Sequence, residues 1–527
     1  MKKPISLTVI ILLLAASNLS AATLYVSLES TNPTPPYTNW VTAATNIQQA
    51  VDAAEAGDTV LVMDGRYALG ERATFDSLGS YLGADRVAIT STIALLSVNG
   101  PQYTVIDGGG TTQCVFLTNG ASLTGFTLTN GYRSGIGGGG VGCTSVNAVL
   151  TNCLIIDNWA ENGGGAYGGT LYNCTLRGNS AQTNTFYMDG VGGGANGSVL
   201  YNCTLTGNVA KSGGGTSGST LYNCTLAGNS AVINLGGGAA QSTLYNCTLT
   251  GNSAYSGGGA GGGTLYNCTL TENSARAGGG AFGGPTPCTL YNCTLTANTG
   301  GGVVWSTLYN CIVAYNTASG GANYDPYGYS TLNYCCTTPM PTNGVGNIAD
   351  DPLFVNYDRG NLRLQSNSRC INAGNNAYVS TSTDLDGRPR IVGGTVDMGA
   401  YEFQPGVSGA FIGWLQQYGL PTDGSADYAD TDADGMNNWQ EWVCGTDPTN
   451  RLSALRLLSP SITSTNVTVT WQSVAGVDYF LERSASLAAP FMLLATNILG
   501  QAGATSYADT NAAGKGPSFY RVGIRSP

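Results

Sequence analysis

A short acidic segment late in the chain has the residue types and spacing of a metal-binding loop. It reads Asp-x-Asp-x-Asp-Gly from position 430, and a glutamate stands at position 441. In a twelve-residue calcium loop, carboxylates at positions 1, 3 and 5, a carbonyl at position 7 and a bidentate glutamate at position 12 surround the ion. Carboxylates this close repel one another without a cation, so we expect structural Ca²⁺ here. The expected ligands are Asp430, Asp432, Asp434, the carbonyl of Met436 and Glu441.

Three more aspartates near this loop could serve a second ion: Asp423, Asp427 and Asp447. Helix-like stretches at residues 411–418 and 437–443 would hold the loop from both sides. The alternative is an acidic linker that binds no metal. If calcium is bound, we expect it to couple two domains rigidly.

Histidine is absent from the chain, and this limits the chemistry available to it. Ser-His-Asp and Cys-His catalysis, histidine general bases and histidine-ligated zinc sites are excluded. The acids and bases between residues 143 and 320 are few: Asp157, Glu161, Asp189, Glu272, Arg177, Lys211 and Arg276. The sequence therefore assigns no catalytic residue, and an active site, if one exists, is expected within residues 64–142 or 180–191.

The middle of the chain is built from one repeated segment, first seen clearly as Thr-Leu-Tyr-Asn-Cys-Thr-Leu at residues 170–176. A unit this short cannot bury its own apolar face, so it must stack on the next copy. The sequence thus predicts a solenoid with regular coils over about residues 149–336. The repeated cysteines are Cys153, Cys174, Cys203, Cys224, Cys247, Cys268, Cys293 and Cys311.

Stacking places equivalent side chains of successive coils in columns ~4.8 Å apart. Cysteines in such a column point in parallel instead of converging, so we favour buried free thiols over disulfides. A second asparagine follows each cysteine by five positions, and we expect its amide to satisfy turn backbone. Reading the Asn-Cys-Thr segments as glycosylation sites is the alternative. The second asparagines are Asn158, Asn179, Asn208, Asn229, Asn252, Asn273, Asn298 and Asn316.

A column of tyrosines accompanies the cysteines: Tyr172, Tyr201, Tyr222, Tyr245, Tyr266, Tyr291 and Tyr309. If the leucines and cysteines face inward with a bend at Asn173, these rings form a stripe outside. Such a stripe could contact sugar rings or a partner surface. Self-stacking that stabilises one sheet is the alternative, and strict alternation with the tyrosines inward also stays open.

The repeats resemble those of right-handed parallel β-helix proteins. The Leu-Thr-Gly-Asn-type tetrads and Gly-Gly-Gly-Ala turns are similar to the repeats of polymorphic outer-membrane proteins. The resemblance implies an all-β, right-handed parallel β-helix and an adhesin role. Residues 350–403, with Asp-Asp-Pro-Leu-Phe at 350–354 and Asp-Leu-Asp-Gly-Arg-Pro-Arg at 384–390, resemble the choice-of-anchor Q region that closes bacterial β-helix proteins. The acidic segment resembles dockerin and thrombospondin type 3 calcium segments.

These patterns predict four parts. Residues 1–22 are expected to be a signal peptide, with Lys2 and Lys3 before an apolar run and a small-residue cleavage site. Residues 23–403 form the β-helix, with a short helix within 45–56 closing its N-terminal end. Residues 410–450 form the calcium connector. Alternating runs in residues 452–527 predict an immunoglobulin-like or fibronectin-III-like β-sandwich.

The composition limits the kinds of partner that the protein can bind. The net charge is −11, and only 10% of residues are charged, so no basic surface for nucleic acid is expected. No segment of the mature chain is apolar for the ~18 residues that a membrane span needs. We expect a monomeric bacterial protein, secreted or on the outer cell surface, that acts as a binding and adhesion scaffold for polysaccharide or cell-surface glycan. A calcium-dependent polysaccharide lyase of the pectate type is the alternative, and a purely structural surface component is a further one.

Overall fold

The computed structural model describes residues 21–524, apart from gaps at 76–80, 136, 183–189, 285, 320, 326–327, 393, 405–408, 423–425, 428, 464–465, 485–490 and 513–517. The expected signal peptide thus falls almost wholly outside the described residues. The chain divides into two units. One comprises Met1–Pro352 with Ser368–Glu402, and the other comprises Leu353–Asn367 with Phe403–Pro527.

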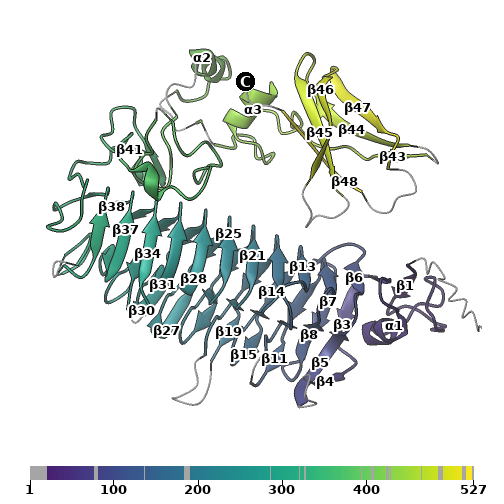
Figure 1. The fold of residues 1–527 in the computed structure, drawn as a ribbon. Coiled ribbons are helices and arrows are strands. Elements are labelled where there is room, and N and C mark those ends of the chain that lie inside the picture. Colours follow the sequence, from purple (N-terminus) through teal and green to yellow (C-terminus); the bar gives the residue numbers. More distant parts are fainter. Residues whose placement is uncertain are drawn as a thin grey trace, which may run out of the picture. The chain divides into compact units, whose positions relative to one another are not determined.

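The first unit is a parallel β-solenoid, as the repeats predict (Figure 1). Each coil contributes strands to up to three sheets, and equivalent residues of successive coils pair in register, as Leu171 with Leu200 and Leu200 with Leu221. The solenoid is therefore a stack whose columns follow directly from the repeat.

The first sheet has 22 strands. They are β1 (Thr23–Val26), β2 (Thr59–Val62), β4 (Arg72–Phe75), β5 (Tyr81–Ile89), β6 (Ala94–Ser97), β8 (Gln113–Leu117), β9 (Ser122–Thr124), β12 (Val141–Cys143), β13 (Val149–Thr151), β16 (Ala166–Tyr167), β17 (Thr170–Tyr172), β20 (Ala195–Asn196), β21 (Val199–Tyr201), β24 (Thr216–Ser217), β25 (Thr220–Tyr222), β28 (Ala239–Tyr245), β31 (Ala260–Tyr266), β33 (Ala281–Phe282), β34 (Cys288–Tyr291), β36 (Val303–Val304), β37 (Ser306–Tyr309) and β39 (Thr331–Asn333). All pairs among them are parallel except β4 with β5, which form an antiparallel hairpin.

The second sheet has 12 strands and the third has six. The second contains β3 (Gly65–Tyr67), β7 (Thr104–Asp107), β10 (Thr127–Thr129), β14 (Leu154–Ile156), β18 (Thr175–Arg177), β22 (Thr204–Thr206), β26 (Thr225–Ala227), β29 (Thr248–Thr250), β32 (Thr269–Thr271), β35 (Thr294–Thr296), β38 (Ile312–Ala314) and β40 (Cys336–Thr337). The third contains β11 (Tyr132–Arg133), β15 (Trp159–Ala160), β19 (Ser180–Ala181), β23 (Val209–Ala210), β27 (Ser230–Leu235) and β30 (Ser253–Ser256).

One coil shows how the sequence sets the side-chain directions. Leu171, Cys174 and Leu176 are at most 1% exposed and join the continuous solenoid core. Asn173 between them has φ of 53°, a left-handed conformation that asparagine tolerates, and it turns the chain from the first sheet into the second. The bend lets Leu171 and Cys174 both face inward although they are three residues apart. Tyr172 therefore lies on the outer face, half-buried.

The N-terminal helix α1 (Ile47–Ala53) lies within the segment expected to be helical but is shorter than that segment. Asn46 is its N-cap and accepts a hydrogen bond from the backbone N–H of Gln48 at 2.8 Å. Ile47 and Val51 are buried in the solenoid core. The helix thus packs its apolar face against the first strands.

Residues 368–402 return to the solenoid after its last coil. The backbone N–H of Ala400 donates to Oγ1 of Thr294, and that of Gly399 donates to the carbonyl of Asn310. Asn310 also accepts the N–H of Asn375 on its side chain. This segment, which contains the 3₁₀ turn η2 (Asn376–Tyr378), covers the bend between the first and second sheets at the last coils.

The second unit contains helices and small antiparallel sheets. Its elements are β41 (Phe354–Asn356), η1 (Tyr357–Arg359), β42 (Asn361–Leu364), α2 (Gly409–Gln417), α3 (Asn438–Cys444), β43 (Ser461–Ile462), β44 (Val467–Ser473), β45 (Asp478–Ser484), β46 (Met492–Leu499), β47 (Gly503–Asp509) and β48 (Phe519–Ile524). Two three-stranded sheets, β43-β44-β47 and β46-β45-β48, enclose a core around Trp471 and Tyr479. Of residues 350–403, the segment with β41 and β42 falls in this unit and residues 368–402 fall in the first.

Candidate functional site

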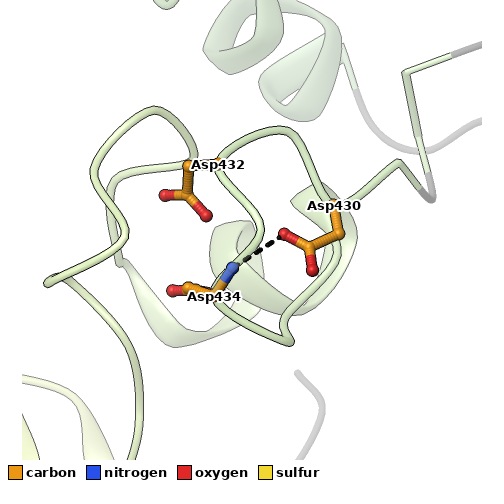
Figure 2. Close-up of side chains that lie close together, drawn as sticks. All are labelled: Asp430, Asp432 and Asp434. Carbon is orange, nitrogen blue, oxygen red and sulfur yellow. Dashed lines mark hydrogen bonds between the residues drawn. The ribbon is translucent and has the colours of Figure 1, made fainter.

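The acidic loop gathers three carboxylates at one point. One carboxylate oxygen from each of Asp430, Asp432 and Asp434 lies within 4.8 Å of the other two, and the three side chains surround a common space (Figure 2). Backbone donors fold the loop around them. Asp430 accepts the N–H groups of Asp434 and Gly435 at 3.1 and 3.0 Å. Asp434 accepts that of Met436 at 2.7 Å.

Several carboxylate oxygens of the loop accept none of these hydrogen bonds and are therefore available to ligate a cation. Both carboxylate oxygens of Asp432, Oδ2 of Asp434 and Oε2 of Glu441 are buried and have no hydrogen-bond partner among the described residues. A buried carboxylate oxygen without a donor costs free energy that a hard divalent ion would recover. The donor set is all oxygen, which suits Ca²⁺.

The pKa shifts of the acidic side chains also favour a bound cation. Burial, and then the charges of Asp432 and Asp434, raise the pKa of Glu441 to about 8. Burial and the charge of Asp434 raise the pKa of Asp432 as well. Without a cation, the surrounding protein therefore disfavours the ionised forms of Asp432 and Glu441. A bound cation would favour the ionised forms instead. The residues present fit Ca²⁺.

The helices set the position of Glu441. Asn437 caps α3 and forms a reciprocal pair of hydrogen bonds with Gln440, so the helix starts immediately after the loop. Glu441, on its first turn, is fully buried, and its Oε1 accepts from the hydroxyl of Thr446 at 3.4 Å.

Of the three aspartates predicted to bind a second ion, two lie in the part of the chain that the structure describes. The carbonyl of Asp427 accepts the N–H of Trp439, which ties the segment before the loop to α3. The carboxylate of Asp447 accepts two bonds from Thr449 within its own turn. Asp423 lies outside the described residues. These acids therefore remain predictions for a second ion.

The tyrosine column lies on the outer face of the first sheet. Its seven rings are half-buried, with centroids 4.8–5.1 Å apart and planes within 12° of parallel. Each inner ring is stacked on both faces, so the column presents ring edges and hydroxyl groups. Tyr378 of the returning segment stacks on Tyr309 at 4.2 Å and ends the column.

The bend beside this column carries a row of asparagines. The side-chain amide of Asn223 donates to Oδ1 of Asn202, that of Asn246 to Asn223, and that of Asn267 to Asn246, at 3.0–3.3 Å. Asn267 also donates to Thr381 and to the carbonyl of Thr383 at 2.8 Å. The returning segment thus covers the row at its C-terminal end, while Asn202 and Asn223 lie on the part that it leaves uncovered.

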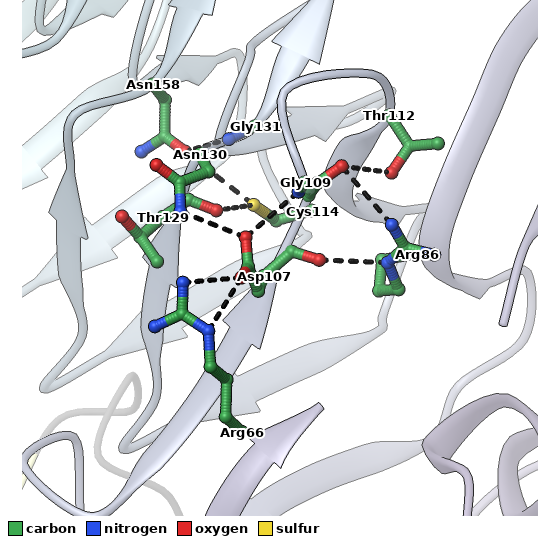
Figure 3. A network of polar contacts seen from close by, with 11 residues as sticks. Arg66, Arg86, Asp107, Gly109, Thr112, Cys114, Thr129, Asn130, Gly131 and Asn158 are labelled. Atoms are coloured by element: carbon green, nitrogen blue, oxygen red, sulfur yellow. Dashed lines mark hydrogen bonds and ion pairs between the residues drawn. The ribbon is translucent and has the colours of Figure 1, made fainter. Parts of the chain in front are cut away.

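A polar network lies in the first coils, within the residues where an active site was expected (Figure 3). Asp107 accepts from Nε of Arg66 at 2.7 Å, from the side-chain amide of Asn130 at 3.1 Å and from the N–H of Gly109 at 2.9 Å. Burial acts to raise the pKa of Asp107, but these bonds outweigh it and hold that pKa below its ordinary value. Arg86, buried beneath, donates to the carbonyl of Asp107 at 2.9 Å.

Beside the network, Tyr132 and Trp159 stack with centroids 4.8 Å apart and planes 7° from parallel. The sequence analysis did not identify this pair. A signal existed, because each aromatic residue follows an Asn or Asp by two positions, as in Asn130-Gly131-Tyr132 and Asp157-Asn158-Trp159. Tyr132 belongs to a coil that precedes the regular repeat, where the alignment of columns is hard to read, and Trp159 belongs to the first coil of the repeat.

Two other charged residues of the regular coils lie apart from this region. Arg276 lies over the ring of Tyr255, 5.2 Å from its centroid. Glu272 occupies a left-handed bend position, with φ of 57°. No described carboxylate pairs with either residue among the salt bridges found in the structure.

No family model and no curated protein matches the chain. The resemblances to polymorphic outer-membrane repeats, the choice-of-anchor Q region and dockerin segments therefore remain predictions. No helix among the described residues is long and apolar enough to cross a membrane.

Solved structures of low similarity include pectate lyase Pel9A, with 14% identity over 73% of this chain and 98% of that one and a TM-score of 0.36. A complex of XylC with xylose has 9% identity over 73% of this chain and 99% of that one, with a TM-score of 0.37. The A-module of mannuronan C-5 epimerase AlgE6 from Azotobacter vinelandii has 14% identity over 58% and 95%, with a TM-score of 0.28.

Proposed function

We propose that this protein is an extracellular or cell-surface scaffold that binds glycans on the outside of its solenoid and uses Ca²⁺ as a structural ion in its second unit. The observation that carries the proposal is the column of seven half-buried tyrosines on the first sheet, whose rings are stacked with nearly parallel planes. A regular row of this kind suits a polymer better than a small molecule, because each coil offers the same groups again.

The chemistry of the column favours a hydroxyl-rich partner. The ring faces cover one another, so a ligand meets apolar ring edges and phenol hydroxyls. Tyrosine hydroxyls keep their protons at neutral pH and can donate. Burial and the neighbouring tyrosines raise the pKa of Tyr201 and Tyr266 further. The amides of Asn202 and Asn223 at the adjoining bend add further donors and acceptors.

Calcium has a separate role in this proposal. Asp430, Asp432, Asp434 and Glu441 would hold the ion with the carbonyl of Met436 and fix the start of α3. The orphaned oxygens of Asp432 and Glu441 support this assignment. The ion would order the loop that links α2 and α3, while glycan contact would take place on the first unit.

Retention on immobilised polysaccharides tests the proposal. The wild-type protein is expected to be retained on at least one polysaccharide, and a Tyr222→Ala/Tyr245→Ala variant is expected to elute several-fold earlier. Tyr255→Ala is the matched control, because Tyr255 is exposed on the third sheet of the same unit. Equal retention of the double variant and wild type would remove the column from the proposal.

The same incubations separate binding from the competing lyase activity. A lyase releases unsaturated sugars that absorb in the ultraviolet. The pair of Arg66 with the ionised Asp107, in the coils where an active site was expected, is the observation that favours this alternative. Product that forms with calcium and stops on chelation would replace the scaffold proposal, whereas retention without product supports it.

A further inference from the structure

An open groove of about 460 Å³ crosses the first coils of the solenoid at the bend between the second and third sheets. This volume is within the range of small-molecule sites, ~300–1,000 Å³. Side chains and backbone of three successive coils line the groove. The lining residues used below are Gly109, Gly110, Asn130, Tyr132, Asp157 and Trp159.

The groove is where the solenoid leaves an aromatic face uncovered. Tyr132 lies on β11, which begins the third sheet, so its ring is stacked on one side by Trp159. Gly109 and Gly110, which have no side chains, line the same groove from the preceding coil. A Cβ added at Gly110 would meet nothing within 4 Å. The space beside the ring is therefore open, in contrast to the tyrosine column, whose inner rings are covered on both faces.

Trp159, the other member of the pair, has no aromatic neighbour in the next coil. Trp159 pairs in register with Ser180 in the next coil, a small side chain. The coils beyond have Val209 and Ser230 at the same position. The pair thus stands as two rings between small residues and does not belong to a longer column.

Hydrogen-bond acceptors border the open face. Asp157 is exposed, with φ of 55°, and among the described residues no group donates to its carboxylate. The side-chain amide N–H of Asn130 donates to Asp107, so the side-chain carbonyl oxygen of Asn130 can accept a hydrogen bond from a ligand. Both arginines of the network already have partners: Arg66 is paired with Asp107, and Arg86 donates to the carbonyls of Asp107 and Gly108. The groove therefore combines an aromatic face with acceptors and carries an unpaired negative charge.

We propose that this groove is a sugar-binding site for a neutral residue of a polysaccharide. The apolar C–H face of a sugar ring would pack on Tyr132, and its hydroxyl groups would donate to Asp157 and Asn130. A uronic acid would place its carboxylate against Asp157, which disfavours acidic glycans. The inference rests on the proposed glycan-binding function and names the sugar class and a second location for it.

Titration calorimetry with neutral hexasaccharides of glucose, xylose and mannose, and with a galacturonate hexasaccharide, tests this site. At least one neutral sugar is expected to bind wild type roughly tenfold more tightly than the galacturonate. Trp159→Ala and Tyr132→Ala are each expected to weaken neutral binding roughly tenfold, because burial and ring contact are worth about 1.5 kcal/mol. Tyr255→Ala, in an exposed position away from the groove, is expected to bind as wild type.

Asp157→Asn is the most specific test of the role of the charge. Asparagine accepts the left-handed conformation at this position, so the fold is retained while the charge is removed. Neutral binding is expected to weaken severalfold, and the discrimination against galacturonate is expected to shrink. Thermal unfolding of each variant checks that the solenoid is intact.

Three results would overturn the inference in different ways. Neutral binding that survives in Tyr132→Ala, Trp159→Ala and Asp157→Asn would place the sugar elsewhere and leave the proposed function standing. Tighter binding of galacturonate than of every neutral sugar would contradict the ligand class. Binding of none of these sugars by the wild-type protein would remove the site, and the proposed function would fall with it only if the protein were also retained on no immobilised polysaccharide.

Discussion

Oδ1 of Asn252 accepts two hydrogen bonds from Asn229, one from its backbone N–H and one from its side-chain amide, both at 2.9 Å. The same amide of Asn229 donates to the carbonyl of Leu205 at 2.9 Å. Equivalent bonds join the buried asparagines from Asn158 to Asn316. Each asparagine side chain thus satisfies a backbone N–H and a backbone carbonyl of the preceding coil, here those of Asn208 and Leu205, and also bonds the asparagine side chain of the next coil.

Asn229→Ala is therefore expected to lower the free energy of unfolding by about 3–5 kcal/mol, because it leaves the N–H of Asn208 and the carbonyl of Leu205 buried without partners. Urea denaturation measures the loss. Asn223→Gly is the control, since Asn223 is exposed in a left-handed bend that glycine also adopts. A loss in Asn229→Ala no larger than in the control would show that the buried ladder contributes little.

The parts of the fold that could be predicted from the sequence are those in which near neighbours in the chain become neighbours in space. Leu171 and Cys174 recur in every regular copy, and the position of Leu176 is always aliphatic, with Ile155 in the first copy and Val313 in the last, so their burial follows from stacking. The clustering of Asp430, Asp432 and Asp434 could be predicted for the same reason, since these carboxylates lie within five residues of one another. The phase of the tyrosines was harder, because it depends on the bend at Asn173.

Contacts between distant segments could not be predicted. Thr294 receives the N–H of Ala400 across 106 positions, and nothing near either residue signals the contact. The pair of Tyr132 and Trp159 depends on the register between an irregular coil and the first regular one. The groove beside it depends on missing side chains at Gly109 and Gly110, which in the sequence look like ordinary turn glycines.

Calcium is expected to raise the unfolding temperature of the second unit, and a chelator is expected to reverse this. At a calcium concentration 100 times the dissociation constant, the added stability is about 2.7 kcal/mol. Glu441→Gln is expected to abolish the gain, because it removes the carboxylate expected to bind on both oxygens. Without calcium, the same variant is expected to be at least as stable as wild type, since burial and the neighbouring aspartates raise the pKa of Glu441 to about 8.

Differential scanning calorimetry with calcium or with chelator measures both effects. Asp478→Asn, at an exposed position on β45 of the same unit, is the matched control and should keep the calcium response. A calcium shift that persists unchanged in Glu441→Gln would place the ion elsewhere.

The cysteines are expected to stay reduced and unreactive in the folded protein. The backbone N–H of Cys203 donates to the sulfur of Cys224 at 3.4 Å, and that thiol donates to the carbonyl of Tyr222 at 3.3 Å, so each thiol has a place in the backbone network. All of the cysteines are buried, which keeps a reagent away from them. Burial also raises the pKa of Cys143 and of Cys288, which lie outside the column, to about 12 and keeps these two thiols protonated. A thiol reagent should label the protein only after denaturation. Rapid labelling before unfolding, or a shift in unfolding temperature with reductant, would contradict this.

The attachment of residues 368–402 is expected to weaken as the pH rises. Glu402 is buried and accepts the N–H groups of Val392 and Asp397, while burial and the charge of Asp397 raise its pKa from 4.5 to about 8. Between these two values the folded chain holds a proton that the unfolded chain has released. This group's contribution to stability is therefore complete below pH 4.5 and falls until the pH passes about 8.

Thermal unfolding measured from pH 4.5 to 9 checks the slope, and Glu402→Gln should flatten it, because glutamine does not titrate. Glu482→Gln is a suitable control, since Glu482 lies on β45 in the other unit. An identical pH slope in Glu402→Gln and wild type would show that another group is responsible.

The two interpretations of the tyrosine column can be separated by removing a hydroxyl group without removing a ring. Tyr222 stacks on Tyr201 at 4.8 Å and on Tyr245 at 4.9 Å, so Tyr222→Ala loses two ring contacts and is expected to cost about 1–3 kcal/mol of stability. Tyr222→Phe keeps both contacts and is expected to unfold as wild type does. If the hydroxyls contact glycan, Tyr222→Phe/Tyr245→Phe should lose retention on polysaccharide at unchanged stability. If this variant is retained as strongly as wild type, the column serves to stabilise the first sheet, and the groove at Tyr132 becomes the site through which the solenoid must bind its ligand.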